Sequence, residues 1–250
     1  MASSHRLRPL PLGASYDDHF FGGFDELLPN DVPERVNDEA LVDHGELWTT
    51  PLAANVAAES LVLEGKLPIT PLGYRKQLRL DGSTLTLEYH LANLGRRSLD
   101  LLWKLHPALR ISPGAEIVVP ARTARVADPQ WTRVVETEQF AWAEKPSLHF
   151  VPESDGSTEF LYLLDLMRGE CMLRHPRENW SIRLTFPLEI FSSVWLFASF
   201  GGWRDLEMLI LEPCTTPQLS LADSAKRGQC LHLGPGQSID ATVTIELNDA

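Results

Sequence analysis

Short runs in which apolar and polar residues alternate recur along the chain from about residue 60. In the run 84–93, leucines and one tyrosine occupy every second position, which makes one face apolar. A period of two is typical of a β-strand with one buried face. Asp81-Gly82 separates this run from another at 74–80, and Asp-Gly favours a tight turn because glycine adopts positive φ. The pattern therefore predicts a β-hairpin.

Similar runs predict further strands along the rest of the chain. They lie at 61–67, 99–106, 115–120, 159–166, 181–186, 193–200, 206–212 and 239–247. The run 193–200 is apolar on both faces, which is typical of a central strand. A single short helix is expected at 220–227, because Ser220 can cap its start and Gly228 can end it. The first 40 residues have no persistent period, and residues 1–20 are expected to be irregular or extended.

Many short strands with little helix indicate an all-β fold, a largely antiparallel sandwich or barrel with at most one or two short helices. No stretch has the composition of a linker, and no internal repeat is visible. Residues 1–250 are therefore expected to form one domain.

Charge and cysteine content narrow the classes of partner and compartment. The net charge of -12 disfavours a nucleic-acid surface, which needs clustered lysine and arginine. Three cysteines without zinc-type spacing make a disulfide framework and a zinc site improbable. The N-terminus lacks the apolar core of a secretory signal, and the most apolar stretches are too short to span a bilayer. We therefore expect a cytoplasmic protein without membrane or nucleic-acid partners.

His106 and Glu212 are the first candidates for chemistry, because each is a polar residue at the end of an apolar run. His106 is either a structural histidine held by a backbone carbonyl or a general acid, since histidine titrates near neutral pH. Glu212 is either a rim carboxylate paired with an arginine such as Arg75 or a buried general base. Burial would raise its pKa toward the working range of such a base.

A third candidate is His44, which follows Asp43 and precedes Gly45, and which could also be a loop histidine without a role. Three tryptophans lie beside these polar groups: Trp48, Trp103 and Trp203. At least one is expected in the core, whereas a tryptophan at a pocket rim can stack on a sugar ring. Metal ligation by the two histidines and Glu212 is a weaker alternative, and no metal site is expected.

Taken together and in order, these groups resemble the aldose 1-epimerase (galactose mutarotase-like) superfamily, from about residue 20 to the end. The matching segments are Gly22-Gly-Phe-Asp-Glu-Leu-Leu-Pro29, Asp43-His-Gly-Glu-Leu-Trp48, Leu102-Trp-Lys-Leu-His-Pro107, Gly201-Gly-Trp203, Leu211-Glu-Pro-Cys-Thr215, Ser220-Leu-Ala-Asp-Ser224 and Leu233-Gly-Pro-Gly236.

The resemblance implies a β-supersandwich that interconverts the anomers of a free or modified aldose without a cofactor. It implies that Glu212 is the general base, that His106 is the general acid and that His44 hydrogen-bonds the sugar. Weaker substrate-binding assignments complete the set: Asp25, Glu26 and Trp203 as cleft residues, Arg75 in place of an arginine that the family has upstream of the first histidine, and Asp165 as an aspartate that contacts the sugar.

Two other readings compete with this expected isomerase activity. One is a non-catalytic carbohydrate-binding or sensor protein on the same scaffold, and the other, supported by analogy of fold alone, is a lyase or hydrolase module. The expected partner is a small sugar. Relatives have several strands before the segment that matches Gly22, so a sheet edge is expected to lack its usual cover. An open edge favours pairing, which raises the expectation of a homodimer.

Overall fold

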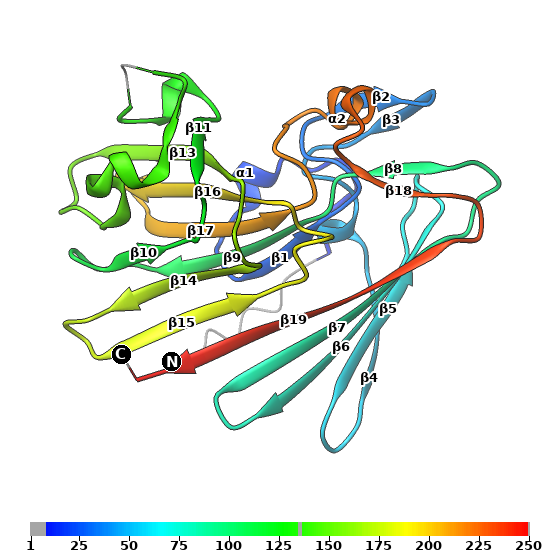
Figure 1. Ribbon diagram of the computed structural model, residues 1–250. Coiled ribbons are helices and arrows are strands. Elements are labelled where there is room, and N and C mark those ends of the chain that lie inside the picture. Colours follow the sequence, from blue (N-terminus) through cyan, green and yellow to red (C-terminus); the bar gives the residue numbers. More distant parts are fainter. Residues whose placement is uncertain (1–8, 135–136, 250) are drawn as a thin grey trace.

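The alternating strands assemble into two large antiparallel sheets that lie one against the other in this computed structural model, which describes residues 9–134 and 137–249 (Figure 1). The seven-stranded sheet has the order β1 (Phe24–Leu27), β9 (Lys104–Arg110), β17 (Glu207–Cys214), β16 (Ser193–Phe200), β13 (Ser157–Leu164), β11 (Thr123–Val126) and β12 (Gln139–Ala141). The eight-stranded sheet has the order β10 (Glu116–Val118), β14 (Glu170–His175), β15 (Trp180–Thr185), β19 (Ser238–Asn248), β7 (Thr84–Asn93), β6 (Leu72–Asp81), β5 (Leu61–Lys66) and β4 (Ala53–Val56).

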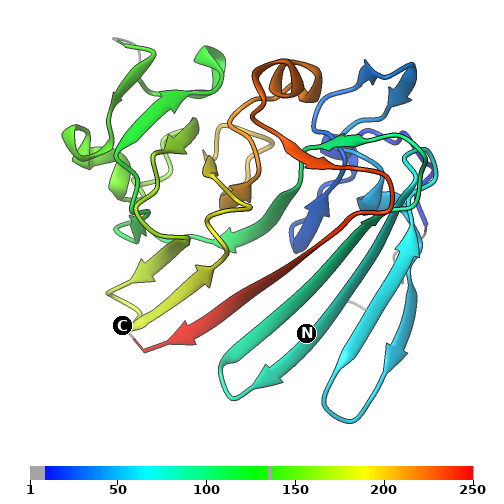
Figure 2. The ribbon, with the colours of Figure 1, turned by 45° about the vertical axis from the view of Figure 1, so that its right-hand side comes forward.

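Smaller elements close the ends of this sandwich. Two short pairs of strands are β2 (Glu34–Val36) with β3 (Glu39–Leu41), and β8 (Leu99–Leu101) with β18 (Leu231–Leu233). The helices are α1 (Tyr16–His19) and α2 (Leu221–Arg227), with 3-10 turns η1 (Leu47–Thr49), η2 (Pro129–Trp131), η3 (Trp142–Glu144) and η4 (Pro146–His149). Figures 1 and 2 both show α2 beside the β2–β3 hairpin. No helix in the described ranges is both long enough and apolar enough to cross a membrane.

The all-β sandwich and most of the predicted strands are confirmed, including the hairpin whose turn holds Gly82 at φ +56°. The run 193–200 is indeed a central strand, because β16 pairs on both sides, with β13 and β17. Helix α2 has the predicted ends: Ser220 accepts a hydrogen bond from the backbone N–H of Asp223, and Gly228 adopts the left-handed conformation. The carboxylate of Glu34 also accepts from the backbone of Leu221 and Ala222, which joins α2 to β2.

Three expectations were wrong. The run 99–106 is two strands in different sheets, β8 and β9, separated by Leu102 and Trp103. The first 40 residues contain strands β1 and β2 and the start of β3, which are too short to establish a visible period. Part of the segment 1–20 is helical, because Ser15 caps the single turn α1; residues 1–8 lie outside the described residues.

Alternation along the strands gives the seven-stranded sheet two different faces. Leu209 and Leu211 of β17 point into the core between the sheets and are fully buried there. Met208, Ile210 and Glu212 alternate with them and therefore lie on the opposite, outer face. The candidate site is built on this outer face.

Candidate active site

A cavity of about 270 Å³ lies on the outer face of the seven-stranded sheet. Its polar lining residues are Tyr16, Asp17, Asp31, His44, Lys104, His106, Asp128 and Glu212. Its apolar lining residues are Phe20, Val32, Trp131, Phe160, Phe197, Trp203, Met208, Ile210 and Leu219. The cavity therefore brings together three sequence candidates, His44, His106 and Glu212, from segments that are far apart in the chain.

Glu212 is buried in the lining of the cavity, with 2% of its side chain exposed. Burial raises the pKa of its carboxyl to about 7, although the nearby Lys104 ammonium opposes this shift. Its Oε2 atom makes an ion pair with Nζ of Lys104, at 2.9 Å, but no well-aligned hydrogen bond in the described structure. Pairing with Arg75 is thus wrong, and Glu212 is a desolvated carboxylate whose partner is a lysine.

Lys104 supplies the cation that burial of Glu212 requires. Its Nζ atom lies 2.6 Å from Oδ1 of Asp31 and 2.9 Å from Oε2 of Glu212, and it sits 4.2 Å from the ring centre of Trp195. Burial alone would lower the pKa of this lysine, but Asp31 and Glu212 outweigh it and raise the pKa above its usual value. Lys104 is therefore a fixed positive charge that two carboxylates share.

His106 lies two residues after Lys104 on β9, so the two side chains share the outer face. Its Nε2 atom is 4.0 Å from Oε2 of Glu212, and its Nδ1 atom is 3.1 Å from the hydroxyl of Tyr16. Burial, together with the charges of Lys104 and His44, holds the pKa of His106 well below its usual range. A neutral imidazole thus faces a carboxyl group that titrates near pH 7.

His44 approaches the cavity from a loop with an unusual backbone. His44 and Gly45 both have positive φ, +53° and +74°, and a Cβ atom at Gly45 would overlap the carbonyl oxygen of Leu28. Only glycine fits here, and the turn fixes where His44 lies. The Nδ1 atom of His44 is 2.8 Å from Asp43. Burial alone would lower the pKa of His44, but Asp31 and Asp43 raise it above the usual value.

Glu26 does not reach the cavity, although its neighbour Asp25 lies near it. Adjacent residues of a strand point to opposite faces, so only one of them can face the site. Glu26 points into the interior, where its Oε1 atom accepts hydrogen bonds from Lys76, at 2.6 Å, and Tyr89, at 2.8 Å. The assignment of Glu26 to the cleft is therefore wrong for a reason of strand geometry.

Arg75 and Asp165 are also placed elsewhere. Arg75 lies on β6 of the other sheet, beside the inward-pointing Lys76, and donates to Gln77. Asp165 accepts a hydrogen bond from Thr123 and lines a shallow hollow at the end of β13. Neither side chain lines the cavity with His106, so the structure does not support a role for them in binding there.

The remaining candidates lie in or beside the site. Trp203 lines the cavity. Asp25 and Trp48 line a neighbouring hollow on the other side of Tyr16. Trp103 is fully buried, which confirms that at least one of the three tryptophans belongs to the core.

Sequence reasoning missed Tyr16, Asp31 and Lys104. A signal existed for Lys104, because a charged residue two positions before His106 in an apolar strand must share its face. Asp31 and Tyr16 come from the region without a period, and nothing in their local sequence indicates contact with residues about 70 to 90 positions away.

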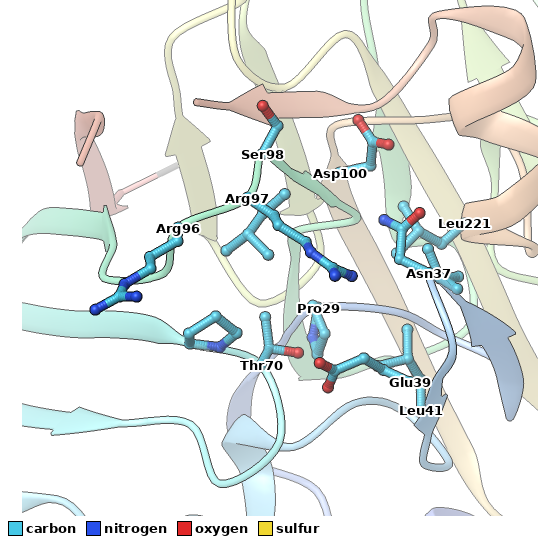
Figure 3. A pocket seen from close by; sticks show the side chains of 13 residues that line it. Pro29, Asn37, Glu39, Leu41, Thr70, Arg96, Arg97, Ser98, Asp100 and Leu221 are labelled. Carbon is cyan, nitrogen blue, oxygen red and sulfur yellow. The ribbon is translucent and has the colours of Figure 1, made fainter. Parts of the chain in front are cut away.

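A second cavity, of about 290 Å³, lies between the β2–β3 hairpin, the β7–β8 loop and α2 (Figure 3). Arg97 points into it, whereas Arg96 points away. Its carboxylate Asp100 pairs with His232, its buried Thr70 donates to Glu46, and Asn37, Glu39, Arg96, Arg97 and Ser98 are exposed. It holds no buried acid–base pair among the described residues, so the chemistry is better sought at Glu212. Across the same residues, no three His, Cys, Asp or Glu side chains gather closely enough to hold a metal ion.

Comparisons with known proteins place this geometry in a structural context. No protein-family model and no curated protein matches the chain. A protein from Synechocystis sp. PCC 6803 is similar in structure, with a TM-score of 0.72 and 17% identity over 91% of this chain and 78% of its own. A protein from Escherichia coli K12, named provisionally as an aldose 1-epimerase, has a TM-score of 0.72 and 17% identity over 91% of this chain and 84% of its own.

A galactose mutarotase-like protein from Lactobacillus casei ATCC 334 has a TM-score of 0.67 and 12% identity, over 90% of this chain and 85% of its own. At such identities the likeness concerns the path of the backbone and leaves the chemistry to the site itself. The chain therefore has the galactose mutarotase-like fold.

Proposed function

We propose that this protein interconverts the α and β anomers of a free or modified aldose, with Glu212 and His106 as its acid–base pair. The observation that carries this proposal is the position of the buried Oε2 atom of Glu212, which lines the cavity, pairs with Lys104 and lies 4.0 Å from Nε2 of His106. A carboxylate oxygen has two lone pairs, so Oε2 can accept a hydrogen bond from a ligand hydroxyl while it remains paired with Lys104.

The cavity suits a small polyol. Its volume of about 270 Å³ is near the lower limit of the roughly 300–1,000 Å³ that is usual for ligand pockets, which favours a monosaccharide over a polymer. Its lining offers both charged and hydrogen-bonding groups and aromatic rings. A pyranose can contact both kinds of group, because its hydroxyl groups form an equatorial edge and its C–H groups form apolar faces.

The reaction moves two protons at one carbon. Glu212 removes the proton from the anomeric hydroxyl while His106 gives a proton to the ring oxygen, and the bond between the anomeric carbon and the ring oxygen breaks. The open aldehyde rotates about its C1–C2 bond and closes on the other face, with the two roles exchanged. Both oxygens are bonded to the anomeric carbon, so groups a few ångströms apart reach both. Each group contributes about 10²–10⁴-fold.

The other polar groups hold the sugar in place. His44, held by Asp43, donates from its remaining ring nitrogen to a sugar hydroxyl. Lys104 keeps the charge of the pair balanced when Glu212 is ionised. Every step uses groups of this chain and moves only protons, so the reaction needs no redox or group-transfer cofactor.

Polarimetry tests the proposal. Freshly dissolved α-anomers of several monosaccharides should mutarotate faster with the protein than in buffer, and Glu212→Gln should remove the excess rate, a loss of at least about 10²-fold. Glu159→Gln is the matched control, because Glu159 is an equally buried carboxylate of the same sheet that pairs with Arg133 outside the cavity.

An excess rate that survives in Glu212→Gln would refute the mechanism. Saturable binding of a sugar without any excess rate would instead identify a carbohydrate-binding protein, and release of sugar from an oligosaccharide would identify a hydrolase or lyase.

A further inference from the structure

Tyr16 is the residue that connects both histidines of the cavity, although it comes from the one-turn helix α1. Only 3% of its side chain is exposed. Its ring stacks on His44, with centres 4.3 Å apart and planes 14° apart, and meets His106 edge-on at 5.4 Å. Its backbone N–H donates to Asp43, the same carboxylate that holds His44. This one side chain is thus packed between the two rings.

The hydroxyl group of Tyr16 lies between Asp25 and His106. It is 2.9 Å from Oδ2 of Asp25 and 3.1 Å from Nδ1 of His106. Strand pairing fixes this arrangement, because Asp25 of β1 is the direct partner of His106 on β9. The three groups form a short chain that leads away from the cavity, on the side of His106 opposite Glu212.

We infer that Tyr16 is a positioning residue, which together with Asp25 holds His106 in the tautomer whose Nε2 lone pair faces the cavity. A hydroxyl group has one proton, and Tyr16 donates it to Oδ2 of Asp25. The oxygen of Tyr16 is then left to accept, so Nδ1 of neutral His106 must be the nitrogen that carries the hydrogen. The tautomer follows from the contacts of Tyr16, whereas its importance for catalysis rests on the proposed function.

The consequence for catalysis concerns which nitrogen of His106 exchanges a proton. With the Nδ1 hydrogen held by Tyr16, His106 gains and loses its second proton at Nε2, the nitrogen 4.0 Å from Glu212. In the other tautomer Nε2 would already carry hydrogen, and the ring could not accept a proton on the cavity side. A carboxylate that fixes a histidine tautomer directly has this effect in serine proteases; here the carboxylate acts through a tyrosine.

Nitrogen-15 NMR of the imidazole rings tests this directly on the free protein. We expect His106 in the wild-type protein to be neutral at pH 7.5, with hydrogen on Nδ1 and not on Nε2. Tyr16→Phe removes the acceptor and should shift His106 toward the Nε2–H tautomer. Asp25→Ala removes the acceptor of the Tyr16 hydroxyl proton, which releases Tyr16 to donate to Nδ1, and should shift it in the same direction.

The activity readout uses the same variants. Tyr16→Phe should lower kcat for mutarotation by about 10- to 100-fold, with a small change in KM, because the sugar contacts remain while the proton exchange is impaired. The matched control is Tyr89→Phe, since Tyr89 is also a buried tyrosine that donates to a carboxylate, Glu26, but touches neither histidine. It should change neither the tautomer nor the rate.

The outcomes separate the two proposals. An Nε2–H tautomer in the wild-type protein, or a tautomer unchanged in both variants, would overturn the positioning role. The expected tautomer and its shift in the variants, in a protein that does not speed mutarotation, would support the positioning role and refute the proposed reaction.

Discussion

Lys104 and burial act on Glu212 in opposite directions, and the balance sets the pH at which the pair works. Burial raises the pKa of Glu212, Lys104 lowers it, and the result is about 7. His106 stays neutral well below its usual range. Below pH 7, Glu212 and His106 of the free protein therefore share one proton, which is on Glu212. Transfer of this proton to Nε2 of His106 gives the form that reacts.

This balance predicts the pH dependence of mutarotation. The pair needs one proton in total, and it loses that proton as the pH rises through about 7. We therefore expect kcat/KM to fall about tenfold per unit above this pH, and to stay level below it until His106 also becomes protonated. The check is a polarimetric profile after subtraction of the buffer rate. A level rate between pH 6 and 9 would contradict it.

Removal of Lys104 should move the fall in kcat/KM to higher pH. In Lys104→Met the cation that lowers the pKa of Glu212 is gone, so burial dominates and the fall in rate should begin at a higher pH. The variant also leaves Asp31 and Glu212 without their shared partner, a change that typically destabilises by about 3–5 kcal/mol. Urea unfolding measures the second effect and the pH profile the first. A fall in rate that begins at a lower pH than in the wild-type protein would contradict the role of Lys104 in lowering the pKa of Glu212.

At the scale of residues, the sequence allowed prediction of His44, His106 and Glu212, because a polar residue at the end of an apolar run is visible without a structure. Alternation allows only one of the neighbours Asp25 and Glu26 to face the site, but β1 is too short to be recognised from the sequence, so the sequence did not show which one. Tyr16 could not have been found, since its role depends on the pairing of β1 with β9, which joins residues about 80 positions apart.

At the scale of elements, alternation was sufficient to predict the long strands, because each has enough residues to repeat its period. It failed between residues 99 and 106, where two strands of different sheets follow each other with the same pattern. The chain changes sheets at Leu102 and Trp103, which are both fully buried, so no turn residue marks the change. Short strands such as β1 remained undetected for want of length.

The loop that carries His44 gives a prediction at this scale. Gly45→Ala would force a Cβ atom against the carbonyl oxygen of Leu28, so the loop must move and His44 with it. Gly82→Ala is a matched control, because Gly82 also has positive φ but its Cβ atom would meet nothing within 4 Å. The control should lose about 1 kcal/mol. Gly45→Ala should lose more, and its KM for the sugar should rise.

Chemical unfolding and Michaelis–Menten kinetics of the two glycine variants measure these effects. Equal losses of stability in the two variants, with an unchanged KM for both, would show that the turn does not position His44.

At the scale of the whole molecule, the eight-stranded sheet has one open edge at β4, whereas Phe150 bridges to Glu116 at its other edge, β10. The β4 edge is exposed at all four residues and carries no charge, and Val56 is 78% exposed. Uncharged open edges favour pairing with another chain. The homodimer expected from the sequence stays a prediction, as does the single domain, and β4 is the edge at which we would look for the partner.

The charge of the whole chain and that of the cavity have the same sign. The chain carries a net charge of -12, and the cavity is lined by four carboxylates, Asp17, Asp31, Asp128 and Glu212, against Lys104 and two histidines. Recognition of a phosphate group normally uses converging arginine or lysine side chains. No arginine is among the described residues that line this cavity. The net charge of the chain and the carboxylates of the cavity therefore both favour a neutral sugar over a sugar phosphate.

A thermal-shift comparison of neutral and phosphorylated hexoses tests this selectivity. Ligand binding to the native state at one hundred times Kd adds about 2.7 kcal/mol, which for a chain of this size raises Tm by about 5–10 °C. We expect such a rise with a neutral aldose and little or none with its 6-phosphate. Trp203→Ala should reduce the rise, because Trp203 forms part of the apolar wall, whereas Trp180→Ala should not, because Trp180 stacks on His175 away from the cavity. An equal or larger rise with the 6-phosphate would show that groups outside this carboxylate-rich lining determine which sugar is bound.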